Sequence, residues 1–165
     1  MNWEPLATWL ETTILHEWMV NFYWMFPLME TLHFLGLSIM FGALLLIDCR
    51  VLGLGKFINM KAAMAFIPVA IAAFAINLIS GILFLAADPF NYLANLVFQW
   101  KIALIIIAGI NALWFWFGEH EELSRLADGQ DAPYRAKVVA LISLVIWVLV
   151  IIAGRMIPYG PGGSG

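Results

Sequence analysis

The sequence predicts an all-α integral membrane protein, a four-helix bundle preceded by a short N-terminal amphipathic helix. Of its 165 residues, 64% are hydrophobic and 12% are charged, about half the share of charged residues in a typical soluble domain. Four stretches of at least 17 residues contain no Asp, Glu, Lys or Arg. These stretches are continuously apolar and do not alternate, which favours spanning helices over the strands of a membrane barrel.

The charge-free stretches predict four membrane spans, at residues 22–52, 62–87, 96–117 and 138–157. A spanning helix needs about 20 mostly apolar residues, and each range provides them. The chain therefore divides into three parts: an N-terminal segment, a membrane domain and a flexible tail or linker, at residues 1–19, 20–159 and 160–165.

The N-terminal segment has the pattern of an amphipathic helix. Trp3, Leu6, Leu10 and Ile14 recur at helical spacing, which places them on one face. The opposite face is acidic, so attraction to anionic lipid does not hold this helix to a membrane. We expect the segment to pack over the outer ends of the four spans.

Lys and Arg residues predict the orientation. Six of the eight lie in or beside the first and third loops, at Arg50, Lys56, Lys61, Arg125, Arg135 and Lys137. Because basic loops stay in the cytoplasm, both loops are expected there, with the N-terminus and the C-terminus periplasmic. The net charge of −3 and the absence of a basic patch argue against a nucleic-acid partner.

Four ionisable residues are expected to gather near the outer surface. His33 lies 15 residues before Asp48, about 22 Å further out at 1.5 Å per residue, and Glu30 is one turn beyond it. Lys101 begins the third span and Arg155 ends the fourth. Ionisable residues at membrane depth are candidates for function.

This cluster predicts a redox cofactor, with b-type haem as the first candidate. His33 is the candidate axial ligand, because a neutral imidazole in a helical bundle commonly ligates haem, and Lys101 and Arg155 are candidates to bind the propionates. The second axial position stays open. His16 is a candidate for it if the N-terminal segment folds over the bundle. The alternatives are Met156, a residue of another protomer, or a haem with this position empty.

Three other interpretations stay open. Met25, Met29 and His33 fall at i, i+4 and i+8, and thioether and imidazole groups suit Cu(I). Alternatively, His33 hydrogen-bonds a quinone head group. In the third interpretation the polar cluster is a structural network within a non-enzymatic scaffold or assembly subunit.

The remaining polar residues are expected to serve structure. Asp48 and Arg50 are expected to form an ion pair that closes the first span, and Asn77 and Asn111 to hydrogen-bond across helices. Along the second span, small residues form a stripe that admits a close neighbour or a second copy of the chain, at Ala70, Ala73, Asn77 and Gly81. The chain is therefore expected to form a homo-oligomer.

Several strings resemble an uncharacterised family of bacterial inner-membrane proteins with four spans. They are FPLMETLH (residues 26–33), FQWK (98–101), GINAL (109–113) and the segments 42–53 and 143–155. The resemblance implies a bacterial cytoplasmic membrane, and it implies that seven polar residues belong to the family pattern: Glu30, His33, Asp48, Arg50, Lys101, Asn111 and Arg155. Many relatives have a histidine at the end of span three, where this chain has Trp116.

The functional hypothesis from the polar cluster is electron transfer between the quinone pool and a periplasmic redox partner.

Overall fold

The computed structural model describes residues 3–127 and 129–160, and the regular structure in these ranges is helical. Four of the described helical segments are long and apolar enough to cross a membrane: Met25–Leu52, Met60–Ala87, Leu96–Ser124 and Tyr134–Tyr159. The prediction of an all-α, multi-pass membrane protein is confirmed at this level.

The spans contain the longest helices of the described chain. The first is α3 (Met25–Leu52), and the second joins a short α4 (Met60–Met64) to α5 (Ile67–Ala87). The third runs from α7 (Leu96–Trp114) through a π-helical turn, η1 (Phe115–Glu119), into α8 (His120–Ser124). The fourth is α9 (Tyr134–Met156), which ends in the 3-10 turn η2 (Ile157–Tyr159).

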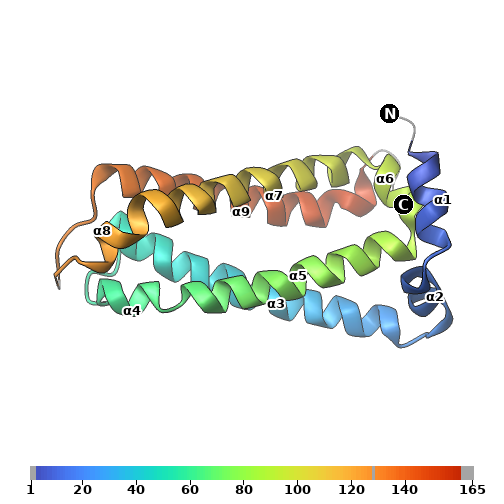
Figure 1. Cartoon of the computed structure of the whole chain (residues 1–165), viewed down its shortest axis with the longest axis horizontal. Coiled ribbons are helices and arrows are strands. Elements are labelled where there is room, and N and C mark those ends of the chain that lie inside the picture. Colours follow the sequence, from blue (N-terminus) through green and yellow to red (C-terminus); the bar gives the residue numbers. More distant parts are fainter. Residues whose placement is uncertain (1–2, 128, 161–165) are drawn as a thin grey trace.

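The two ends of the molecule carry different elements (Figure 1). Both described chain ends lie at one end, with α1 (Glu4–Glu11), α2 (Ile14–Asn21) and α6 (Pro89–Ala94). We call this the terminal end. The other end, which we call the loop end, holds α4, α8 and the loops that follow α3 and α8.

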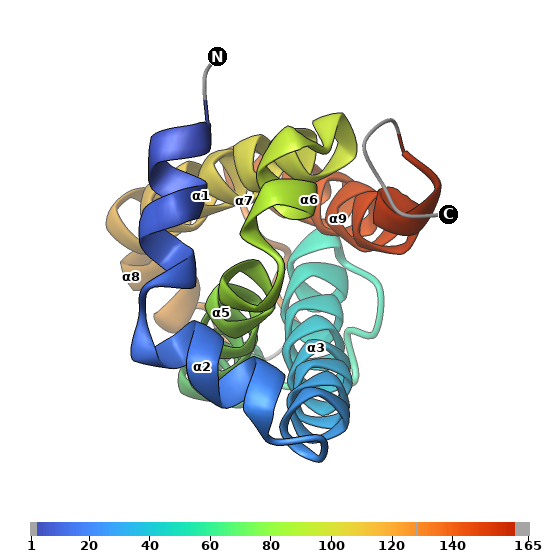
Figure 2. The same cartoon turned by 90° about the vertical axis from the view of Figure 1, so that its right-hand side faces the viewer.

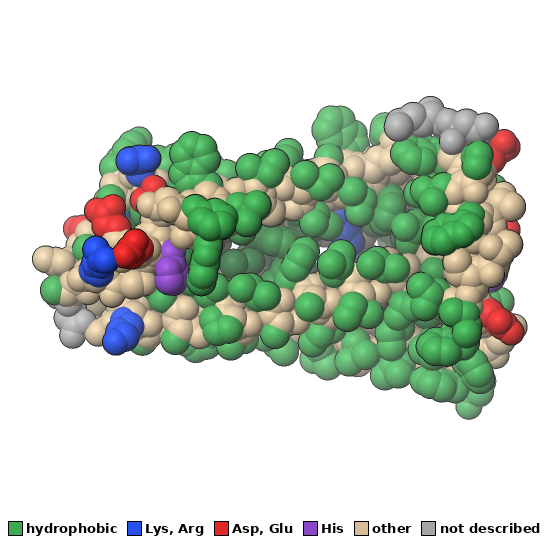
Figure 3. Space-filling view, in the orientation of Figure 1, with side chains coloured by type: hydrophobic (Ala, Val, Ile, Leu, Met, Phe, Trp, Pro, Cys, Tyr) green, Lys and Arg blue, Asp and Glu red, His purple; other side chains and the backbone are tan. Residues whose placement is uncertain are grey.

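The four long helices form two pairs. Helix α3 packs against α5, α7 packs against α9, and the pairs meet where α3 contacts α9. Within the described residues α5 and α7 make almost no contact with each other, and the end view shows them apart (Figure 2). The molecular surface is hollowed between them (Figure 3). The bundle is therefore closed along α3–α9 and open between α5 and α7.

The seam between α3 and α5 depends on small residues. Ala70, Ala73 and Asn77 are buried on α5, and a Cβ at Gly36 of α3 would lie only 3.1 Å from Asn77 Nδ2 and 3.2 Å from the Ala73 carbonyl oxygen. The predicted small-residue stripe thus serves this contact within the chain.

The N-terminal segment is two helices, so the prediction of a single amphipathic helix is wrong. The hydroxyls of Thr12 and Thr13 donate to the carbonyls of Trp9 (2.7 Å) and Leu10 (2.6 Å) where α1 ends, and Thr13 then caps α2. Such local bonds compete with helix continuation. Helix α1 packs on α6 and α5, and α2 on α5 and α3. Of the predicted tail, residues 161–165 lie outside the described ranges.

Candidate functional site

A cavity of about 490 Å³ lies in the half of the molecule nearer the terminal end. We call it the terminal cavity. Its wall includes all four residues of the predicted polar cluster, together with apolar side chains of α3, α5, α7 and α9: Glu30, His33, Lys101 and Arg155. The structure thus brings together side chains from three helices that are distant in sequence.

His33 is held in one orientation by a neighbouring helix. Its Nδ1 lies 2.8 Å from Ser80 Oγ on α5, and Phe84 contacts the ring edge to face at 5.5 Å. The Ser80 hydroxyl directs its own hydrogen to the Ile76 carbonyl at 2.7 Å. With its hydrogen on Ile76, the Ser80 oxygen can accept from the His33 tautomer that carries its proton on Nδ1. This assignment leaves the His33 Nε2 lone pair free to bind a ligand.

The basic side chains of the terminal cavity are not neutralised by its one acid. Among the described residues no ion pair joins Glu30 to Lys101 or Arg155. Lys101 is half-buried, and the Arg155 guanidinium lies 5.8 Å from the centre of the Tyr159 ring. With a neutral His33, the wall carries one excess positive charge. It therefore suits an amphipathic molecule that bears a negative group.

Tyr92 adds a hydrogen-bond donor from α6, outside the spans. Burial, followed by the nearby carboxylates of Asp88 and Glu30, raises the pKa of Tyr92 above its usual value. Its hydroxyl therefore stays protonated at neutral pH. Tyr92 lines the terminal cavity, so it can donate to a bound oxygen.

Four other predicted ligands lie elsewhere. His16 Nδ1 is 2.8 Å from the Ala86 carbonyl oxygen, so this ring binds the end of α5. Neither His16 nor Met25 nor Met29 is among the residues that line the terminal cavity. Met156 is also outside its wall and is 47% exposed. The structure therefore supplies no second axial ligand from these side chains.

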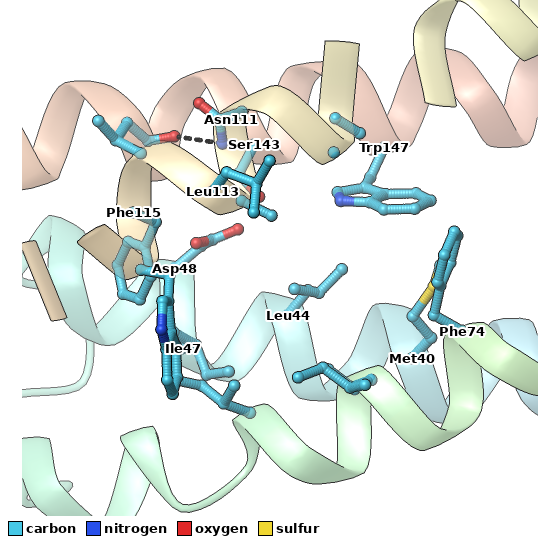
Figure 4. A pocket seen from close by; sticks show the side chains of 18 of the residues that line it. Met40, Leu44, Ile47, Asp48, Phe74, Asn111, Leu113, Phe115, Ser143 and Trp147 are labelled. Atoms are coloured by element: carbon cyan, nitrogen blue, oxygen red, sulfur yellow. Dashed lines mark hydrogen bonds between the residues drawn. The ribbon is translucent and has the colours of Figure 1, made fainter. Parts of the chain in front are cut away.

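A second cavity, of about 310 Å³, lies closer to the loop end and contains Asp48, Asn111 and Ser143 (Figure 4). We call it the loop cavity. Phe74 and Trp147, with ring centres 6.0 Å apart, line both cavities and stand between them. Met40 and Ile105 also line both, so the two cavities are adjacent compartments inside the bundle.

The predicted ion pair between Asp48 and Arg50 is wrong. Residues two apart on a helix point to different faces, and here Asp48 points into the loop cavity (Figure 4). Arg50 is fully buried. It donates instead to the carbonyls of Ile58 (2.6 Å) and Gln130 (3.4 Å).

Asn77 and Asn111, both expected to bond across helices, form different kinds of hydrogen bond. Asn111 Nδ2 donates to the Val139 carbonyl at 3.3 Å, which confirms the expected bond across helices. Asn77 Nδ2 donates at 3.1 Å to Ala73 of its own helix, so the expectation for Asn77 is wrong. The close approach of Gly36 uses the space that a longer-range bond would need.

Ser80, Phe74 and Trp147 were not among the site residues predicted from the sequence. Ser80 is the only hydroxyl residue between Ala62 and Ala87, and its spacing of three from Asn77 places it near the small-residue stripe. A single hydroxyl residue beside this stripe was the sequence feature that could have identified Ser80. No comparable signal marks Phe74 or Trp147 among the many aromatic residues of the spans.

Comparison with known proteins adds no assignment. No protein-family model, no curated protein and no solved structure matches the chain. Proposals about its function therefore rest on the residues themselves.

Proposed function

We propose that the terminal cavity binds b-type haem, with His33 Nε2 as an axial ligand, and that the protein carries electrons. The observation that supports this most is the His33–Ser80 hydrogen bond. A ligating histidine generally donates its other ring N–H to an acceptor, which fixes the tautomer and the orientation of the ring. Ser80 does this for His33.

The other cavity residues fit the remaining parts of a haem. Lys101 and Arg155 would pair with the propionates, and Tyr92 would donate to one of their oxygens. Glycines at two positions leave space beside His33 and Lys101. A Cβ at Gly81 would lie 4.0 Å from His33 Cε1, and one at Gly154 would lie 3.4 Å from Lys101 Nζ. Bound haem would supply a one-electron carrier, with its second axial position filled by another protomer or left open.

We further propose that the terminal end faces the periplasm of a bacterial inner membrane and the loop end faces the cytoplasm. All six of the basic residues that predict the orientation belong to the loops, α4 or the adjoining helix ends at the loop end, as the positive-inside rule requires. In this orientation electrons pass between the membrane quinone pool and a periplasmic redox partner, and a homo-oligomer is the expected assembly.

An absorption spectrum of the purified protein, oxidised and dithionite-reduced, tests the haem proposal. We expect a Soret band in the wild type and its loss in His33→Ala. His16→Ala is the matched control, because its ring binds a backbone carbonyl outside the cavity, and it should keep the band. Lys101→Met and Arg155→Met should each weaken haem affinity about tenfold, the usual effect of losing a charged hydrogen bond.

Other outcomes would overturn the proposal. Protein that binds no haem even after reconstitution, or a His33→Ala variant with an unchanged Soret band, would exclude this site. Stoichiometric copper without haem would favour copper handling. A folded, oligomeric protein with neither group would favour the scaffold.

A further inference from the structure

The loop cavity contains a buried carboxylate with an unused acceptor. Asp48 is 4% exposed, and its Oδ2 has no hydrogen-bond partner among the described residues. The carboxylate points from α3 into the space between the two helix pairs (Figure 4). A buried polar atom without a partner is costly, so this oxygen is well placed to receive a hydrogen bond from a bound molecule.

Apart from Asp48, Asn111 and Ser143, the wall of the loop cavity is mostly apolar, and the cavity lies on the open side of the bundle. Its wall includes Ile71 of α5 and Leu113 of α7, the two helices that make almost no contact with each other. Both side chains are largely exposed, at 61% and 58%, on surfaces that face lipid in a membrane. A ligand can therefore enter from the hydrocarbon layer between α5 and α7.

These features restrict the chemistry of the ligand. It must dissolve in a bilayer, carry at least one hydrogen-bond donor for Asp48, and present a flat apolar body to Phe74, Phe115 and Trp147. The hydroxylated ring of a lipid-soluble quinol meets all three requirements, and an acyl chain meets only the first. A volume of about 310 Å³ is within the usual range of small-molecule pockets.

We propose that the loop cavity binds the head group of a membrane quinol. One ring hydroxyl donates to Asp48 Oδ2, and the isoprenoid tail leaves between α5 and α7. The choice of a quinol among lipid-soluble alcohols rests on the proposed electron-transfer function. The Phe74–Trp147 pair lines both this cavity and the terminal cavity, as do Met40 and Ile105. The quinol ring would therefore lie next to the compartment of the redox group.

Quenching of tryptophan fluorescence in detergent tests the proposal, because Trp116 and Trp147 line the loop cavity. The probe is decylubiquinol under anaerobic conditions, and its dimethyl ether, which has no donor, is the matched ligand. We expect saturable quenching by the quinol and about tenfold weaker binding of the ether, the loss that follows from one buried hydrogen bond. Asp48→Leu should bind the quinol as weakly as the ether.

Further variants separate this proposal from folding defects and from the haem proposal. Asp48→Asn keeps an acceptor oxygen and should bind the quinol more tightly than Asp48→Leu does. Leu113→Trp narrows the opening at an exposed position and should weaken binding without unfolding the protein. His33→Ala and Glu30→Gln alter only the terminal cavity and should leave quinol binding unchanged, even if no haem is ever found.

Non-saturable quenching would show that the quinol only partitions into detergent, and it would overturn the proposal. Equal affinity for quinol and ether in the wild type would do the same, because it would identify the cavity as a site for apolar lipid. Equal quinol affinity in wild type, Asp48→Leu and Leu113→Trp would place the binding elsewhere.

Discussion

Several charged side chains at the loop end bind one another or the backbone, whereas the basic side chains that line the terminal cavity form no ion pair among the described residues. At the loop end Asp131 pairs with Lys56 at 2.9 Å and with Lys137 at 3.6 Å, and Arg50 binds two backbone carbonyls. In the terminal cavity Lys101 and Arg155 form no ion pair with any described residue. This difference indicates that the loop-end charges hold loops in place, while the unpaired charges of the terminal cavity are available to a ligand of opposite charge. Substitutions should therefore affect stability at one end and ligand binding at the other.

The largest loss of stability is expected for Arg50→Met. The change leaves the carbonyls of Ile58 and Gln130 without their Arg50 donor and frees the loops that Arg50 joins. We expect the free energy of unfolding to fall by about 3 kcal/mol, as measured by denaturation with SDS. Arg125→Met is the control, since the exposed pair of Arg125 with Glu121 is worth about 0.5 kcal/mol or less. An equal loss in both variants would show that Arg50 is not a structural centre of this end.

Lys101→Met should stabilise, and not destabilise, protein prepared without a cofactor. An unpaired, half-buried cation is costly, and Met has nearly the same length without the charge. We expect the free energy of unfolding to rise by about 2 kcal/mol, accompanied by the weaker haem binding described above. Lys61→Met removes an exposed cation of the loop end and should change neither quantity. Destabilisation by Lys101→Met would reveal that Lys101 supports the fold, and it would remove the contrast between the ends.

His16→Ala should lower stability modestly and leave the cavity chemistry intact. It removes the hydrogen bond to the Ala86 carbonyl that ties α2 to the end of α5, a contribution of about 1 kcal/mol. The thermal midpoint checks the stability, and the Soret band checks the site. Glu17→Ala, at the neighbouring exposed position, should have a smaller effect. A lost Soret band in His16→Ala would make His16 an axial ligand after all.

The smallest effect is expected for Asp131→Asn. The hydrogen bond from Lys56, helped by the positive charge of Lys137, lowers the pKa of Asp131 below its ordinary value of 3.8. A carboxylate with a lowered pKa stabilises the folded protein above that ordinary value, and this contribution disappears as the pH falls through the lowered pKa. Between about pH 5 and 8 the variant should therefore show a small, constant decrease in thermal midpoint, and the two proteins should converge in stronger acid. A difference that changes across neutral pH would implicate another group.

The spans and the common level of the polar cluster along the bundle were predictable from the sequence. Helix rise converts residue number directly into depth, so Glu30, His33, Lys101 and Arg155 were expected at one level, and they line one cavity. The break at Thr12–Thr13 was not anticipated, because an apolar period alone does not reveal side chains that cap and end a helix. His16 was assigned to the cofactor because the path of α2 across the end of α5 depends on packing.

The sequence by itself determined that this chain has four helices long and apolar enough to cross a membrane, where they lie along the chain, and at which level of the bundle the polar cluster lies. Hydropathy and a fixed rise per residue are local properties, and they suffice for those conclusions. Only the tertiary structure decided which face each helix presents to its neighbours. It joined His33 to Ser80, separated Asp48 from Arg50, and left α5 and α7 apart so that two cavities remain. Rotation about a helix axis and the order of helices in the bundle depend on close contacts, such as Gly36 against Asn77, between residues distant in sequence.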